Sequence, residues 1–127
     1  MAANANIVQK NLIDLTVWQR EIEYDEVLEA IANVNFDVPF KLVEIVELVP
    51  TGEENVINWG YHLFWAAVLS GKTRIWCKVV TDVTPTKNVD NTHAIYKMPV
   101  GQTVPEPIRR FAVDVLHRNV VWSPSNI

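Results

Sequence analysis

The clearest hydrophobic periodicity of the chain lies toward its C-terminal end. Apolar side chains recur there at the three- and four-residue spacing of one helix face: Ile108, Phe111, Ala112, Val115 and Leu116. Thr103 and Glu106 have the spacing of a capping box, and Asn119 is a residue type that often closes a helix. The pattern therefore predicts an amphipathic helix over residues 103–118, with Phe111 and Leu116 in the core.

The most apolar run of the chain extends over residues 61–80 and is interrupted near its middle by Gly71. A helix over residues 59–69 would be apolar on every side except at His62. Such a helix must be buried all round, which a chain of 127 residues rarely achieves. Residues 73–83 are rich in β-branched side chains and alternate as a strand does. The run therefore predicts a β-hairpin with Gly71 in its turn.

The predicted hairpin has one face that combines tryptophan with cations. A two-residue loop places Trp65 opposite Trp76, with Arg74 and Lys78 beside them. A three-residue loop would shift the register, but Arg74, Trp76 and Lys78 would still share a face because they alternate on one strand. An aromatic anchor among cations is typical of protein interfaces. We therefore expect this face to meet another chain.

Shorter patterns predict the other elements. Residues 26–32 predict a helix with acidic side chains in its first turn, where the helix dipole favours them. Residues 7–20 fit a helix, although residues 12–18 suit a strand equally well. Residues 40–49 combine a helical spacing of charges with the β-branched content of a strand, and the helix is slightly favoured. Strands are further predicted over residues 92–98 and 120–122.

These elements predict one α+β domain over residues 1–127. We expect an antiparallel sheet of three to five strands, with N-terminal helices and one C-terminal amphipathic helix packed on one face. A length of 127 residues suits a single domain, and a composition of 49% hydrophobic and 20% charged residues is that of a globular chain.

The charge is distributed unevenly along the chain. Residues 1–54 carry eleven acidic and three basic residues, a net charge of −8, and residues 55–127 carry four acidic and eight basic residues, a net charge of +4. The total of −4 does not favour nucleic acid as the main partner. The halves either neutralise each other within one fold or form opposite surfaces that meet head to tail on neighbouring copies.

No arrangement typical of catalysis or metal binding stands out in the sequence. His62, His93 and His117 are far apart, and Cys77 is the single cysteine. The segment Ser-Gly-Lys-Thr at 70–73 lacks the glycine that a phosphate-binding loop needs six residues before its lysine, where Ala66 stands, and it precedes a predicted strand instead of a helix. We therefore predict no catalytic residue, no cofactor and no metal.

Two charged clusters are candidate binding sites. The acidic residues of segment 21–29 are dense but lack the order of a calcium loop, so we expect a solvated helix start. Arg109 and Arg110 fall in a first helical turn, where the dipole disfavours cations, and Glu106 offsets part of this effect. The arginine pair suits either a partner's carboxylate or phosphate group or an ordinary solvated face.

The chain lacks the features of a secreted or membrane-spanning protein. Residues 1–13 lack the basic and apolar segments of a signal peptide. The uncharged run over residues 56–71 is short for a membrane span and contains polar side chains. We expect a protein of the cytoplasm or of an assembled virion, with no membrane partner.

Five tryptophans in 127 residues favour a function based on contact. We expect a non-enzymatic structural or assembly subunit that contacts copies of itself or other protein subunits, such as a capsid, neck or tail component of a virus or phage particle. One alternative is a small acidic inhibitor or immunity-type binding protein. Another is a small α+β ligand-binding domain or enzyme with a pocket near His62 or His93. The expected interface residues are Trp65, Arg74, Trp76, Lys78, Arg109 and Arg110.

Overall fold

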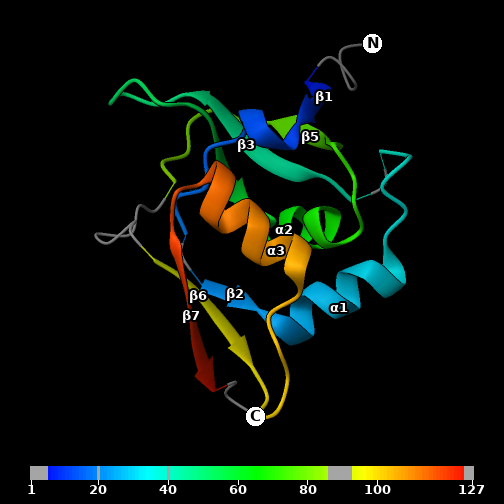
Figure 1. Cartoon of the computed structure of the whole chain (residues 1–127). Helices are drawn as coiled ribbons and strands as arrows, with labels where there is room; N and C mark the ends of the chain where they lie inside the picture. Colours follow the sequence, from blue (N-terminus) through cyan, green and yellow to red (C-terminus); the bar gives the residue numbers. More distant parts are fainter. Residues whose placement is uncertain (1–5, 20, 40, 86–92, 125–127) are drawn as a thin grey trace.

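The computed structural model describes residues 6–19, 21–39, 41–85 and 93–124, and these residues form an α+β fold with two separate sheets (Figure 1). The strands are β1 (Ile7–Asn11), β2 (Glu21–Glu23), β3 (Val43–Leu48), β4 (Glu54–Trp59), β5 (Arg74–Val79), β6 (His93–Met98) and β7 (Asn119–Pro124). The helices are α1 (Tyr24–Asn33), α2 (Tyr61–Leu69) and α3 (Glu106–Arg110). Two shorter helical segments are the 3-10 turn η2 (Leu12–Asp14) and the π-helical turn η3 (Phe111–Val115), which continues α3.

The strands pair in two sheets of different character. Sheet A has the order β1-β5-β3-β4, and sheet B has the order β2-β6-β7. In sheet A the outer pairs are antiparallel, whereas β3 and β5 are parallel, and sheet B is parallel throughout. The chain passes from β3 through β4 and α2 before it enters β5, a connection long enough for parallel pairing. The predicted α+β class is therefore confirmed, but the single antiparallel sheet is wrong.

Helix α2 lies between the two sheets (Figure 1). It contacts β3 and β5 of sheet A, β2 of sheet B, and both other helices. All six side chains from position 63 to position 68 are at most 6% exposed. The predicted hairpin over residues 61–80 is therefore wrong. Two sheets and two helices together enclose a helix that is apolar on all sides, and a one-sheet architecture could not have done so.

Gly71 ends α2 and does not form a hairpin turn. Its backbone is left-handed, with a φ of 74°. Its N–H donates to the carbonyl of Val68 at 3.1 Å, and the N–H of Lys72 donates to the carbonyl of Ala67 at 3.0 Å. This pair of hydrogen bonds is the Schellman arrangement that closes many helices with glycine. The alternation that follows was predicted correctly, since β5 occupies residues 74–79.

The other predicted elements had mixed outcomes. Helix α1 confirms the helix predicted over residues 26–32, and β6 and β7 confirm the two predicted C-terminal strands. The choice between helix and strand was left open for residues 7–20, and a helix over the whole range does not form, because β1 and η2 occupy its first part. The helix favoured over residues 40–49 is wrong, because its β-branched side chains form β3.

The C-terminal helix is present but shorter than predicted. Pro105 is its N-cap residue and no side chain caps it, so the predicted capping box does not form. The helical segment ends at Val115, and the left-handed residue beyond it is His117, with a φ of 56°, instead of Asn119. Ile108 is fully buried, while both predicted core residues of this segment, Phe111 and Leu116, pack against the core half-buried.

Candidate functional site

Strand β5 displays three of the predicted interface residues on one face of sheet A. Ile75 and Cys77 point to the other face and are 2% and 0% exposed, whereas Arg74 and Lys78 are exposed and Trp76 is half-buried. Trp76 lies beside Gln9 of β1 in the strand register. The three helices lie on the opposite side of sheet A (Figure 1). We call the surface formed by Arg74, Trp76 and Lys78 the Trp76 face.

Two polar features characterise the Trp76 face. The indole Nε1 of Trp76 is buried, and it has no hydrogen-bond partner among the residues that the structure describes. A buried donor without a partner costs about 1–3 kcal/mol. Lys78 lies beside Glu44 of β3, so the positive charge of this face is partly balanced within sheet A.

Trp65 does not belong to the Trp76 face. It lies on α2 and is 1% exposed. Its ring centroid is 5.2 Å from that of Phe64 and 5.9 Å from that of Phe111, both in edge-on contact. Its predicted pairing with Trp76 depended on the hairpin and does not form.

The two predicted interface arginines lie on α3, away from the Trp76 face (Figure 1). The guanidinium of Arg109 donates to the Glu106 carboxylate at 3.1 Å through Nε and at 2.5 Å through Nη2. Arg110 lies 3.6 Å from the same carboxylate. The hydrogen bonds from Arg109 hold the pKa of Glu106 below its ordinary value. The Glu106 carboxylate of the same chain therefore already engages Arg109 and Arg110, the two arginines expected to bind a carboxylate or phosphate group of a partner.

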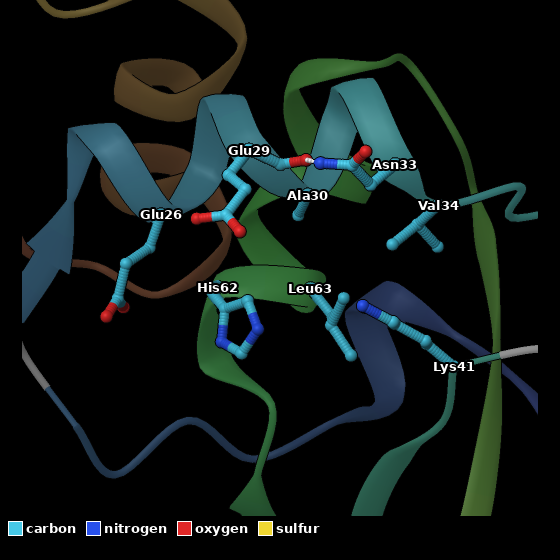
Figure 2. A pocket seen from close by; sticks show the side chains of 8 residues that line it. All are labelled: Glu26, Glu29, Ala30, Asn33, Val34, Lys41, His62 and Leu63. Carbon is cyan, nitrogen blue, oxygen red and sulfur yellow. Dashed lines mark hydrogen bonds between the residues drawn. The ribbon is translucent and has the colours of Figure 1, made fainter.

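A groove between α1 and the start of α2 contains two adjoining cavities of about 440 Å³ and 280 Å³ that share Glu26 and His62. The larger cavity, shown in Figure 2, is further lined by Glu29, Ala30, Asn33, Val34, Lys41 and Leu63. The smaller cavity is further lined by Gln19, Glu21, Ile22, Glu23, Val27, Asn58, Trp59, Gly60, Tyr61 and Trp65. We call the two cavities together the α1–α2 groove.

The carboxylates of the α1–α2 groove differ in how they are neutralised. Lys97 of β6 lies 3.1 Å from Glu21 and 3.7 Å from Glu23, and its hydrogen bond to Glu21 raises the pKa of the lysine. Glu26 and Glu29 form no ion pair within 4 Å with any residue that the structure describes. The negative charge available to a ligand is therefore concentrated on Glu26 and Glu29.

Aromatic groups form the second wall of the groove. Trp59 is 49% exposed, and its ring lies edge-on to that of His62 with centroids 5.6 Å apart. Figure 2 shows His62 and Glu29 facing the same cavity from α2 and α1. Within the described part of the chain, His62 has no hydrogen bond that would orient it. Trp59 and His62 thus line the groove opposite the carboxylates of α1.

Deeper in the smaller cavity lie two groups from α2. Tyr61 donates its hydroxyl to the carbonyl of Ile57 at 2.8 Å, and burial raises the pKa of this tyrosine. Trp65 lines the same cavity, and its buried Nε1 has no acceptor among the described residues. The groove is thus lined by carboxylates of α1 and by aromatic side chains of α2.

Sequence reasoning gave a pocket near His62 as an alternative, but it did not identify Glu26, Glu29 or Trp59 as residues of the α1–α2 groove. Glu26 and Glu29 are one turn apart on a correctly predicted helix, which was the available local signal. Their proximity to Trp59 and His62 depends on α2 being a helix, so the predicted hairpin could not bring these residues together. Across the described ranges, no group of three His, Cys, Asp or Glu side chains is close enough to hold a metal ion, and no helix is long and apolar enough to cross a membrane.

Comparisons with known proteins add little to these observations. No protein family and no curated protein matches the chain. Among solved structures, the chain is similar to protein Atu1540 from Agrobacterium tumefaciens, with a TM-score of 0.46 and 12% sequence identity. That match covers 61% of this chain and 42% of the Atu1540 chain.

Proposed function

We propose that this protein is a non-catalytic assembly subunit that binds other protein chains, copies of itself among them, through the Trp76 face. A component of a virus or phage particle is one form that such a subunit would take. The single observation that carries the proposal is Trp76 itself. It is a half-buried tryptophan on a sheet face without a helix, flanked by two exposed cations and with an unpartnered N–H.

The two ends of the molecule support association of one copy with the next. Arg74 and Lys78 belong to sheet A at the top of Figure 1, whereas Glu26 and Glu29 belong to α1 near the bottom. A contact that sets the cations of β5 against the carboxylates of α1 on the next copy would close into a ring or extend as a filament. Sheet A also carries Glu44, Glu47 and Glu54, so the attraction would be local to Arg74 and Lys78.

Sedimentation of the Trp76→Ala variant tests the proposal. We expect the unaltered protein to form oligomers and the variant to shift toward the monomer, because an interface anchor has been removed. Trp122→Ala is the matched control, since Trp122 is 45% exposed but lies on β7 of sheet B. A wild-type protein that remains a monomer at high concentration, or equal effects of both variants, would contradict the proposal.

An acidic inhibitor or immunity-type binder is the second candidate. The observation that favours it is the pair of exposed, unpaired carboxylates on α1 beside the exposed Trp59. Such a protein would be a monomer that binds a basic partner through α1, with Trp59 as the anchor. A monomer whose affinity for a basic partner protein falls in Trp59→Ala, but not in Trp76→Ala, would support this candidate.

A further inference from the structure

We propose that a groove between η2, the end of α2 and the α3–η3 helix binds a free alkyl carboxylate, a small molecule in which an apolar chain ends in one negative charge. The groove consists of two adjoining cavities of about 460 Å³ and 280 Å³, which share Leu12, Lys72, Phe111 and Val115. We call them together the η2–η3 groove. None of the described residues that line them belongs to the Trp76 face, so this site goes beyond the proposed assembly function.

The apolar stripe of the C-terminal helical segment is wider than the part that the core buries. Ile108 and Ala112 are 0% exposed. Phe111 and Val115 belong to the same stripe but are half-buried, and each of them lines both cavities. Helix α3 packs beside α2 (Figure 1), and Leu12 of η2 adds to the apolar lining. Part of the stripe therefore remains accessible to an apolar ligand.

The backbone of this wall is unusual. Residues Phe111–Val115 form a π-helical turn, in which the N–H of Leu116 donates to the carbonyl of Phe111, five residues earlier, at 3.1 Å. Turns of this kind are rare and occur frequently at functional sites. The first and last residues of the turn are the two side chains that line both cavities. The turn is therefore an indication of a binding site that does not depend on the size of the groove.

The two cavities differ in charge. The larger one is further lined by Asn11, Ile13 and Thr73, and Lys72 is the charged residue among its described lining. The smaller one is further lined by Val68, Pro107, Arg110 and Asp114. Sites for small molecules commonly combine a mostly apolar lining with a few polar groups that fix the orientation of the ligand. An alkyl chain therefore suits the larger cavity, and its carboxylate suits the smaller one, where Lys72 and Arg110 both contribute a positive charge.

Both cations keep hydrogen-bond donors for a ligand. Lys72 lies 3.1 Å from Asp37, and Arg110 lies 3.6 Å from Glu106. The side chains of these two acids are 75% and 50% exposed, and exposed ion pairs are weak. An ammonium group has three N–H donors and a guanidinium has five, so a ligand carboxylate can bind without displacing either acid. The carboxylate of Asp114 at the same cavity disfavours a second negative charge on the ligand.

Titration of the 127-residue chain, followed through its backbone amide signals by nuclear magnetic resonance, tests this site. The probe is octanoate, and we expect saturable shifts of the Thr73 and Val115 signals, with the signal of Val121 on β7 unchanged. Butanoate should bind at least tenfold more weakly, because each buried methylene group contributes about fourfold in affinity. Octylammonium has the same chain and the opposite charge, so it should bind at least threefold more weakly than octanoate.

A matched pair of variants on α3 tests the charge. Arg110→Gln should weaken octanoate binding about threefold to fivefold, because one solvated charge contact is lost. Arg109→Gln is the control, since Arg109 is exposed on the same helix and contacts the same Glu106 carboxylate but lines neither cavity. The control should change affinity less than twofold.

A second pair of variants tests the apolar wall. Ile13 lines the larger cavity and is 66% exposed, so Ile13→Gln leaves the core intact and should weaken octanoate binding about threefold. Val113→Gln is the control, because Val113 is exposed on η3 but lines neither cavity. This control should also change affinity less than twofold.

Three results would overturn the inference. The first is the absence of a saturable shift of the Thr73 and Val115 signals with octanoate. The second is equal affinity for octanoate and octylammonium. The third is an equal loss of affinity within either pair of variants. Because each of these measurements follows ligand affinity and not self-association, the assembly proposal is tested separately.

Discussion

Helix α2 and strand β5 follow one another in the same apolar run of the chain, yet they occupy opposite kinds of environment. Every side chain of α2 from position 63 to position 68 is buried. On β5 only alternate side chains are buried, and the others form the Trp76 face. The difference comes from the neighbours: α2 is enclosed by two sheets and two helices, whereas β5 is covered on one side. The elements that surround a segment therefore decide which of its apolar side chains enter the core.

Replacing the two tryptophans of these regions should give the largest contrast. We expect Trp65→Ala to lower the free energy of unfolding by about 3–5 kcal/mol, because a large, fully enclosed side chain is removed. Trp76→Ala should cost the monomer about 1 kcal/mol, since Trp76 is half-buried at the sheet surface. Urea denaturation at a concentration where both variants are monomeric measures the two values. Equal losses would place Trp76 in the core and remove the main support for a contact function.

The contrast between these regions also explains what the sequence could predict. Arg74, Trp76 and Lys78 were placed on one face correctly, because strand alternation is a local property of the chain. Trp65 was misplaced, because whether residues 61–69 form a helix depends on burial by segments distant in sequence. For β3 the error was the opposite one, a helix predicted where a strand forms. The charges of this segment have helical spacing, but it pairs with β4 and β5, which the local sequence does not reveal.

Local signals were sufficient where an element has one exposed side. Helix α1 shows this, since its acidic first turn and apolar stripe both lie within ten residues. The α1–α2 groove was not predictable in the same way, because it joins Glu26 to Trp59 and His62 across more than thirty positions of sequence.

The two glycines that flank α2 should differ in their sensitivity to substitution. Gly60 has a φ of 99°, and an added Cβ would lie 3.2 Å from the Cα of Val43. Gly71 also has a positive φ, of 74°, but open space surrounds the position of its Cβ. We expect Gly60→Ala to cost about 2–3 kcal/mol, from backbone strain and a close approach to β3, and Gly71→Ala about 1 kcal/mol from strain alone. Thermal and urea denaturation would measure both, and a larger effect at Gly71 would contradict the packing of α2 against β3.

Alkaline conditions should lower the free energy of unfolding through the buried thiol of Cys77 on β5. Burial raises the pKa of the Cys77 thiol from 9.0 to about 12. Above pH 9 the unfolded chain therefore releases a proton that the native state retains, so the free energy of unfolding falls as pH rises. The slope for one such group is about 1.4 kcal/mol per pH unit.

Cys77→Ala isolates this contribution. Burial also raises the pKa values of Tyr61 and Tyr96 above their ordinary value of 10.0. These tyrosines therefore begin to lower the free energy of unfolding about one pH unit above the point at which Cys77 does. We expect the variant to be less stable overall but to lack the decline between pH 9 and pH 10. Denaturant melts at closely spaced pH values measure the slopes, and parallel slopes in variant and wild type would show that the thiol is not buried in solution.

The smallest expected effect concerns charge at the Trp76 face. Exposed ion pairs contribute up to about 1 kcal/mol, and raising salt from 0.15 M to 1 M shortens the screening length from about 8 Å to about 3 Å. If Arg74 and Lys78 assist association, Arg74→Gln should weaken it by a few-fold at low salt and by less at 1 M salt. Lys72→Gln provides the matched loss of charge, since Lys72 pairs with Asp37 at 3.1 Å at the end of α2. Sedimentation across a salt series compares the two variants. If neither salt nor Arg74→Gln changes the association, apolar contact at Trp76 dominates it. If Arg74→Gln and Lys72→Gln weaken association equally, the effect comes from the net charge of the protein and not from the position of Arg74.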